Sequence, residues 1–299
     1  MVRRTPTRLS PKLTAIAGGP VYLKLETEQL GGSFKLRGAL SAMLALSEDD
    51  LSLGVVSASA GNHGLGIALA AEHLGVRATV FVPNTAPVVK RASMAAHAAH
   101  VESTQPSYDK AEDAARTFAR ETGTTFISPC TGRTLLAGQG TVAMEILQDL
   151  PSLGTIIIPV GGGGLAGGIG GYIRGTANGV RILGAQSERT NAMTLALASG
   201  KATDIPDLLT LADGLAGRVD EEMLAQGQAS LDAMATVTEE AIADAIRWLY
   251  REEGITAEGS AAAGVAAIMT GKLKPAAFPV CLVITGGNID KARIMELAL

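Results

Sequence analysis

Short runs rich in β-branched residues alternate with longer alanine-rich stretches along most of the chain. The strand-like runs cover residues 21–26, 55–59, 78–83, 125–128, 155–160, 181–186 and 280–285. Helical patterns lie between them, at residues 65–74, 111–121, 141–150 and 241–253. Several strand-like runs carry apolar residues at consecutive positions, as strands of a parallel sheet buried on both faces do. This alternation predicts an α/β fold with doubly wound parallel sheets.

A chain of 299 residues is long enough to form two lobes of this architecture. The strand-rich stretch 51–133 is interpreted as a small inserted α/β domain, and residues 1–50 together with 134–299 as a large domain. Ligands of doubly wound sheets bind beyond the carboxyl ends of the strands. The loops that follow strands, and a cleft between the two domains, are therefore the expected place for a ligand.

Composition and charge exclude several classes of protein. The chain has 25 basic and 29 acidic side chains, for a formal net charge of −4, so it has no basic excess to displace the counterions of nucleic acid. No run approaches the roughly 18 apolar residues of a membrane helix, and the first residues lack the apolar core of a signal peptide. We expect a cytoplasmic protein with neither nucleic acid nor membrane as partner. Cys130 and Cys281 are too few for a disulfide framework and are interpreted as reduced core thiols.

The sequence lacks the motifs of metal and serine hydrolases, and no metal site is expected. His97 and His100 are interpreted as an exposed pair beside a helix end. Ser107 begins an S-x-x-K match without its companion motifs, and a helix N-cap is the better interpretation. The sequence contains neither H-E-x-x-H nor G-x-S-x-G.

Four consecutive glycines come directly after the strand-like run 155–160 and before a helical pattern. They are Gly161, Gly162, Gly163 and Gly164, here called the tetraglycine loop. Backbone without side chains can wrap around an anion, and the helix N-terminus adds a positive partial charge. Phosphate is the expected ligand. The loop also fits G-x-G-x-x-G, with Glu188 at a suitable distance, so a dinucleotide site stays open.

Three further loops follow strands. Lys35 opens an Ala/Leu helix and is either a solvated helix residue or an amine that forms a Schiff base with an aldehyde. Residues 57–66 place small side chains at a helix N-terminus, where backbone N–H groups can bind a carboxylate. Within that loop Asn62 and His63, taken alone, are more often structural. Residues 284–288 end the last strand with the hydroxyl of Thr285.

Taken in order, these segments resemble the fold type II pyridoxal-phosphate enzymes, in particular the threonine/serine dehydratase group, to which serine racemase is related. The resemblance is carried by residues 32–39, 57–63, 138–141, 161–164 and 285–288, and it extends over almost the whole chain. It implies pyridoxal 5′-phosphate as the cofactor, held in the cleft between the two domains. It implies Lys35 as the catalytic Schiff-base lysine.

The resemblance also assigns the other site residues. The implied cofactor-binding residues are Phe34, Lys35, Asn62, Gly161, Gly162, Gly163, Gly164, Leu165, Glu258 and Thr285. The tetraglycine loop would hold the phosphate, Thr285 would face the pyridine nitrogen, and Asn62 would meet the 3′ oxygen. The implied substrate-binding residues are Ser59, Ala60, Gly61, Asn62, His63 and Gln139.

The function that this resemblance implies is an ammonia-lyase that converts a β-hydroxy amino acid, threonine or serine first, to a 2-oxo acid and ammonia. A neutral hydroxyl at Thr285 does not force the pyridine nitrogen to stay protonated, which favours elimination. Ala60 stands where serine racemases carry a serine, and Gln186 and Ala192 stand where metal-activated relatives carry carboxylates. The alternatives are a serine racemase-like enzyme, a dehydratase for phenylserine or hydroxyaspartate, and, in a different class, a nicotinamide-dependent oxidoreductase. The resemblance suggests a homodimer.

Overall fold

The computed structural model describes residues 1–97, 99–176, 179–206 and 208–298. The chain divides into two compact units. The small unit comprises Met1–Arg3 and Lys35–Gln139, and the large unit comprises Arg4–Phe34 and Gly140–Leu299. Each is built on a largely parallel sheet with helices, so the α/β prediction is confirmed. The domain limits at residues 51 and 133 stay a prediction about where independent folding units begin and end.

The large unit contains a six-stranded sheet in the order β1-β2-β10-β7-β8-β9. Its strands are β1 (Thr7–Leu9), β2 (Val21–Leu25), β10 (Val280–Ile284), β7 (Thr155–Pro159), β8 (Arg181–Ser187) and β9 (Ala233–Val237). Only β1 runs antiparallel to its neighbour among the described strands of this sheet. The carboxyl ends of β10, β7 and β8 therefore lie at one edge, where a doubly wound sheet binds its ligand.

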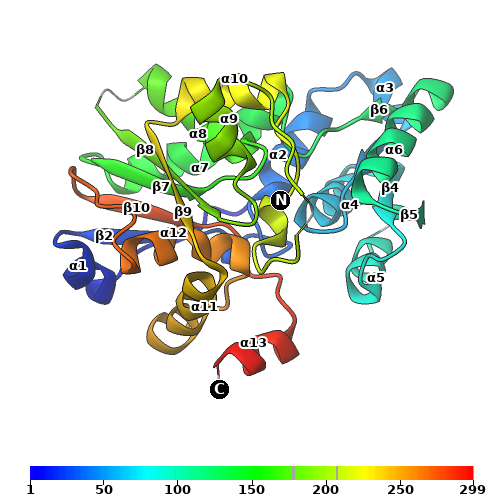
Figure 1. Cartoon of the computed structure of the whole chain (residues 1–299). Coiled ribbons are helices and arrows are strands. Elements are labelled where there is room, and N and C mark those ends of the chain that lie inside the picture. Colours follow the sequence, from blue (N-terminus) through cyan, green and yellow to red (C-terminus); the bar gives the residue numbers. More distant parts are fainter. Residues whose placement is uncertain (98, 177–178, 207, 299) are drawn as a thin grey trace. The chain divides into compact units, whose positions relative to one another are not determined.

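Helices cover both faces of this sheet (Figure 1). The helices of the large unit are α1 (Pro11–Ala17), α8 (Gly164–Thr176), α9 (Ala192–Ser199), α10 (Glu221–Ser230), α11 (Glu239–Glu253), α12 (Gly259–Met269), α13 (Lys291–Ala298), the end of α7 (Arg133–Asp149), and the 3-10 turns η1 (Glu26–Glu28) and η2 (Asp213–Leu215). Strand β10 is apolar at every position because it is buried on both faces. Val280, Leu282 and Ile284 pack in one hydrophobic cluster, whereas Cys281 and Val283 pack in the other. A strand buried on both faces needs a continuous apolar run.

The small unit contains a four-stranded parallel sheet in the order β5-β4-β3-β6. Its strands are β5 (Ala99–Gln105), β4 (Ala78–Pro83), β3 (Val55–Ala58) and β6 (Thr125–Phe126). Its helices are α2 (Lys35–Leu44), α3 (Glu48–Leu53), α4 (Asn62–Leu74), α5 (Val88–Ala95) and α6 (Tyr108–Thr122). The hydroxyl of Ser107 accepts from the N–H of Lys110, so the predicted N-cap is confirmed. No helix in the described part of the chain is both long and apolar enough to span a bilayer.

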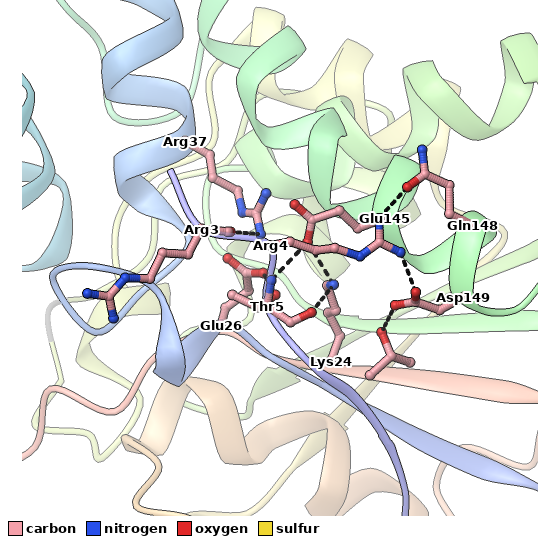
Figure 2. A network of polar contacts seen from close by, with 10 residues as sticks. Arg3, Arg4, Thr5, Lys24, Glu26, Arg37, Glu145, Gln148 and Asp149 are labelled. Atoms are coloured by element: carbon pink, nitrogen blue, oxygen red, sulfur yellow. Dashed lines mark hydrogen bonds and ion pairs between the residues drawn. The ribbon is translucent and has the colours of Figure 1, made fainter. Parts of the chain in front are cut away.

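A buried polar network holds the segment around Thr5 in the large unit (Figure 2). Lys24, with a fully buried side chain, lies 2.8 Å from the carboxylate of Glu145 and donates to the carbonyl of Thr5 at 2.7 Å. The N–H of Thr5 donates to Glu145 at 3.2 Å, and its hydroxyl donates to the buried Glu26 at 2.6 Å. Buried charges are costly unless they are paired and hydrogen-bonded. Thr5 therefore supplies partners that these buried groups need.

Candidate active site

The lysine that sequence analysis singled out is the first residue of α2, in the small unit. The Lys35 ammonium donates a hydrogen bond to the carbonyl of Pro129 at 2.9 Å. The backbone around Lys35 lies against α4 at Gly66, where a Cβ would sit 3.1 Å from the nitrogen of Leu36 and 3.2 Å from the carbonyl carbon of Lys35. A larger residue at Gly66 would push α2 away. The packing of α2 against Gly66 thus sets the position of the Lys35 backbone, and the Pro129 carbonyl sets the direction of its amine.

The segment that carries Pro129 forms its own turn. The Ser128 hydroxyl accepts hydrogen bonds from the N–H groups of Cys130, at 3.2 Å, and Thr131, at 3.1 Å. This turn fixes the carbonyl that meets Lys35. Sequence reasoning did not assign Pro129 a role, because a backbone carbonyl carries no residue-type signature.

Residues 59–63 connect β3 to α4, so the first turn of α4 begins within the predicted substrate loop. The N–H of Gly61 donates to the Ser59 hydroxyl at 3.2 Å, which shapes the loop. Asn62 is the first helical residue, and Ser59, Ala60, Gly61 and Asn62 are half-buried. Backbone N–H groups at a helix start suit a carboxylate. The structure therefore brings this predicted loop to a helix N-terminus in the same unit as Lys35.

His63 is buried behind that loop. Its Nε2 lies 3.4 Å from the carbonyl of Ile127. Burial, and the positive charge of Lys35, lower the pKa of His63 from 6.5 to about 3. The imidazole is therefore neutral at physiological pH.

Gln139, on α7, is a predicted substrate residue with a fully buried side chain. It lies against Gly38 of α2, where a Cβ would come 2.3 Å from the Gln139 Nε2. Neither Nε2 nor Oε1 has a hydrogen-bond partner among the described residues. An unsatisfied buried amide is costly, and native proteins rarely keep one without a ligand or water to bind. The orphaned amide of Gln139 is therefore a strong candidate for a ligand contact.

The tetraglycine loop lies in the large unit, between β7 and α8. A Cβ on Gly161 would sit 3.1 Å from the Cα of Leu215, and Gly163 has φ of +83°, a left-handed conformation that residues with side chains rarely adopt. The N–H of Gly167 donates to the Gly163 carbonyl at 2.7 Å, which starts the helix. Leu165, in the first turn of α8, is buried. Bare backbone at a helix N-terminus is an anion site.

Three other predicted cofactor residues meet at the end of β10, also in the large unit. The N–H of Phe34 donates to the Thr285 carbonyl at 3.1 Å, and the N–H of Glu258 donates to the Gly286 carbonyl at 3.1 Å. Thr285 is only 4% exposed. Because β10 and β7 are parallel neighbours, Thr285 and the tetraglycine loop lie at the same edge of the sheet.

Sequence reasoning also considered His97, His100 and the two cysteines. The Nδ1 of His97 lies 2.9 Å from the carboxylate of Glu72, and the Nε2 of His100 lies 2.6 Å from that of Glu102. No group of three or more His, Cys, Asp or Glu gathers in the described chain. Burial raises the pKa of the Cys281 thiol to about 12. Cys130 is only half-buried, so its prediction as a core thiol is wrong.

Cys130 lies close to a further side chain that sequence reasoning left out. The Tyr108 hydroxyl donates to the carbonyl of Ala58 at 3.4 Å, immediately before the 59–63 loop. Burial, then Glu112, then Cys130, raise the pKa of Tyr108, so the phenol stays protonated. No sequence motif could have found Tyr108 as a neighbour of this loop, because it follows β3 by fifty residues.

Comparisons with known proteins identify the family to which the chain belongs. The chain matches the family described as pyridoxal-phosphate dependent enzyme over residues 1–286. An L-threonine ammonia-lyase of Thermotoga maritima is 40% identical over 291 residues, which cover 97% of this chain and 72% of that protein.

Two solved structures share the fold at similar identity. Maize serine racemase matches with a TM-score of 0.94 and 31% identity, over 99% of this chain and 91% of that chain. The processed form of threonine deaminase isoform 2 from Solanum lycopersicum matches with a TM-score of 0.91 and 32% identity, over 99% and 88%. Of the two cofactors considered for the tetraglycine loop, the family match supports pyridoxal phosphate over a nicotinamide dinucleotide. The chain belongs to the family of pyridoxal-phosphate-dependent enzymes.

Proposed function

We propose that this protein is an ammonia-lyase that converts a β-hydroxy amino acid, threonine or serine first, to a 2-oxo acid and ammonia. The similarity to an L-threonine ammonia-lyase and to a threonine deaminase supports the substrate class. The observation that carries the reaction type is the buried, neutral Thr285 at the end of β10. As the partner of the cofactor's pyridine nitrogen, a hydroxyl would not hold that nitrogen in its protonated form, which would favour loss of a leaving group from Cβ.

The residues at the sheet edge fit the cofactor. The left-handed Gly163 and the close approach of Gly161 to Leu215 form a backbone cradle that side chains would fill. We assign the phosphate to the tetraglycine loop and the N–H of Leu165, at the positive end of α8. When bound, pyridoxal phosphate supplies an aldehyde for an amine and a ring that withdraws electrons from Cα.

We assign the remaining contacts to the cofactor by residue. Lys35 provides the amine for the aldehyde, and Thr285 the partner for the pyridine nitrogen. Asn62 contacts the 3′ oxygen, and Phe34 and Glu258 lie beside the ring. Backbone hydrogen bonds place Phe34 and Glu258 next to Thr285 at the end of β10, and this supports their assignment to one cofactor.

Lys35 is the group that removes the proton from Cα. The Pro129 carbonyl fixes the direction of its amine, and the neutral imidazole of His63 does not compete as an acid. The substrate carboxylate is assigned to the loop formed by Ser59, Ala60, Gly61, Asn62 and His63, at the N-terminus of α4. The amide of Gln139, which otherwise lacks a partner in the described chain, is assigned to the same substrate.

Two alternatives keep specific support. The likeness to maize serine racemase supports a racemase, but the methyl group of Ala60 cannot protonate the second face of Cα, so racemisation should be minor. The half-buried Cys130 lies near Tyr108, beside the loop assigned to the substrate, and phenylserine and hydroxyaspartate stay candidates.

One assay separates these activities. Purified protein is incubated with threonine, serine, phenylserine or hydroxyaspartate, while ammonia, 2-oxo acid and the enantiomers of the remaining amino acid are measured. We expect 2-oxo acid and ammonia in equal amounts from threonine or serine, with little of the opposite enantiomer. Formation of the opposite enantiomer without ammonia would make the protein a racemase.

Labelling tests the role of Lys35. Borohydride should fix the cofactor on the peptide that contains Lys35, and Lys35→Ala should abolish turnover while the protein stays folded. Formation of 2-oxobutyrate by Lys35→Ala at the wild-type rate would refute the assignment.

We further propose that the protein works in the cytoplasm as a homodimer, with a small amino acid as its partner and neither nucleic acid nor membrane. Its net charge of −4 supports the lack of a nucleic-acid partner. The dimer rests on the resemblance alone. Analytical ultracentrifugation tests it, because a single monomer mass at micromolar concentration would contradict it.

A further inference from the structure

The carboxyl end of β8 contains a glutamine that the proposed chemistry does not use. The side chain of Gln186 is fully buried, and both the nitrogen and the oxygen of its amide are hydrogen-bonded. Its Nε2 donates to the carbonyl of Thr190 at 2.8 Å. Its Oε1 accepts from the N–H of Thr194 at 3.0 Å and from the Thr194 hydroxyl at 2.8 Å. One side chain therefore closes the loop between β8 and α9.

These bonds replace an ordinary helix cap. The residue before α9, Asn191, makes no side-chain capping bond to the helix. An N-cap side chain normally accepts from the second or third N–H of the helix. Thr194 is the third residue of α9, so Gln186 caps α9 from the neighbouring strand. The position of the first turn of α9 therefore depends on Gln186.

The first turn of α9 lies directly behind the tetraglycine loop. Met193, fully buried between the two residues that Gln186 holds, places its methyl carbon 3.1 Å from where a Cβ on Gly163 would be. The sulfur of Met193 lies 2.6 Å from where a Cβ on Gly227 of α10 would be. Met193 is thus wedged between α10 and the left-handed glycine of the loop. A displacement of this turn by even an ångström would open space behind Gly163 or press on it.

We infer that Gln186 is a positioning residue for the cofactor phosphate: it caps α9 and, through Met193, holds the tetraglycine loop in its anion-binding conformation. This inference rests on the proposed assignment of the phosphate to that loop.

The chemistry of the amide makes the inference specific. Thr190 offers a carbonyl acceptor and Thr194 offers N–H and O–H donors, so the side chain between them must both donate and accept. An amide does so at every pH, a carboxylate only accepts, and a methionine side chain does neither. A protonated carboxylic acid again does both. Gln186→Glu should therefore behave like wild type only at a pH where the buried acid is neutral.

The test compares two ligands on the full-length chain. Pyridoxal phosphate and pyridoxal, which lacks the phosphate, are titrated into wild type, Gln186→Met and Gln186→Glu, and binding is followed by absorbance. The matched control is Thr155→Val, which removes a buried hydrogen bond to the Ala277 carbonyl at the amino end of β7, away from the loop. Thermal unfolding of each variant is recorded alongside.

We expect Gln186→Met to weaken pyridoxal phosphate about tenfold, the effect of losing one to two hydrogen bonds, while the dissociation constant for pyridoxal stays unchanged. Thr155→Val should change neither dissociation constant. For Gln186→Glu, the dissociation constant for pyridoxal phosphate should approach that of wild type at pH 6 and exceed it at pH 8.

Several results would overturn the inference. If Gln186→Met binds pyridoxal phosphate as tightly as wild type does, the inference is wrong. It is also wrong if the variant loses equal affinity for both ligands, because an equal loss indicates general damage to the fold. If Gln186→Met does not fold, a pH-independent affinity in Gln186→Glu has the same consequence. A wild-type protein that binds pyridoxal as tightly as pyridoxal phosphate would instead refute the phosphate assignment itself, so the two failures are distinguishable.

Discussion

Replacement of Gly163 by alanine tests the phosphate cradle directly. Gly163 has φ of +83°, and its added Cβ would meet the Met193 methyl at 3.1 Å. A residue with a side chain pays about 1–2 kcal/mol for the left-handed conformation. The methyl of Met193 is the flexible end of a side chain, so the contact should add little to that cost.

The strain can appear in either of two measurements. If the loop keeps its shape without the cofactor, the free energy of unfolding of the cofactor-free protein falls by about 1–2 kcal/mol. If the loop relaxes, the cost appears on binding, and the dissociation constant for pyridoxal phosphate rises about 5- to 30-fold. In both cases the cofactor-saturated protein loses about 1–2 kcal/mol, measured by urea unfolding in excess pyridoxal phosphate.

Gly171 provides the matched control. It lies within α8, its φ is not positive, and a Cβ there meets nothing within 4 Å. Gly171→Ala should therefore raise the free energy of unfolding by about 0.5–1 kcal/mol, the usual gain of alanine over glycine inside a helix. If Gly163→Ala gave the same gain and kept wild-type affinity, the cradle argument would be wrong.

Three further predictions concern stability and product. Lys24→Met should lower the free energy of unfolding by about 3–5 kcal/mol, because it removes the lysine that neutralises the buried carboxylate of Glu145. The double variant Lys24→Met/Glu145→Leu should recover much of this loss. Urea unfolding midpoints measure both variants, and equal losses would contradict the pairing. Since the pKa of His63 falls from 6.5 to about 3 on folding, its contribution is complete above pH 6.5 and is lost as pH falls toward 3, at up to about 1.4 kcal/mol per pH unit. Unfolding of wild type and His63→Gln at pH 7.5, 5.5 and 4.5 should show a shallower decline in the variant, and parallel curves would exclude this role. Ala60→Ser should raise racemisation relative to elimination, and chiral chromatography that finds an unchanged product ratio would refute the missing-acid argument.

The interior strands could be predicted from sequence, whereas most strands at sheet edges could not. Strands such as β7 and β10 are buried at every position, and that demands a continuous apolar run. The strands that were missed, β1, β5 and β9, each form an edge. An edge strand has one free side and tolerates polar residues, as in the sequence AHVESTQ of β5, so its pattern does not differ from that of a loop.

The candidate site divides in a similar way. Loops that carry bare backbone or an unusual residue after a strand could be found, because glycine runs and an isolated lysine there have few structural explanations. Contacts that these residues make with backbone oxygens could not be found from the sequence. The carbonyl of Pro129 lies ninety-four positions from Lys35, and the capping role of Gln186 depends on which face of β8 it occupies. Such contacts follow from tertiary packing, which no local pattern records.

The interrupted course of the large unit bears on how the chain folds during synthesis. Its first segment, Arg4–Phe34, leaves the ribosome well before Gly140–Leu299, which supplies the rest of that unit. Lys24 therefore emerges long before Glu145, the carboxylate that neutralises it. The main segment of the small unit, Lys35–Gln139, is continuous and can fold as soon as it emerges. A nascent chain stalled after residue 139 has left the ribosome should thus hold a protease-resistant small unit behind a still cleavable leading segment.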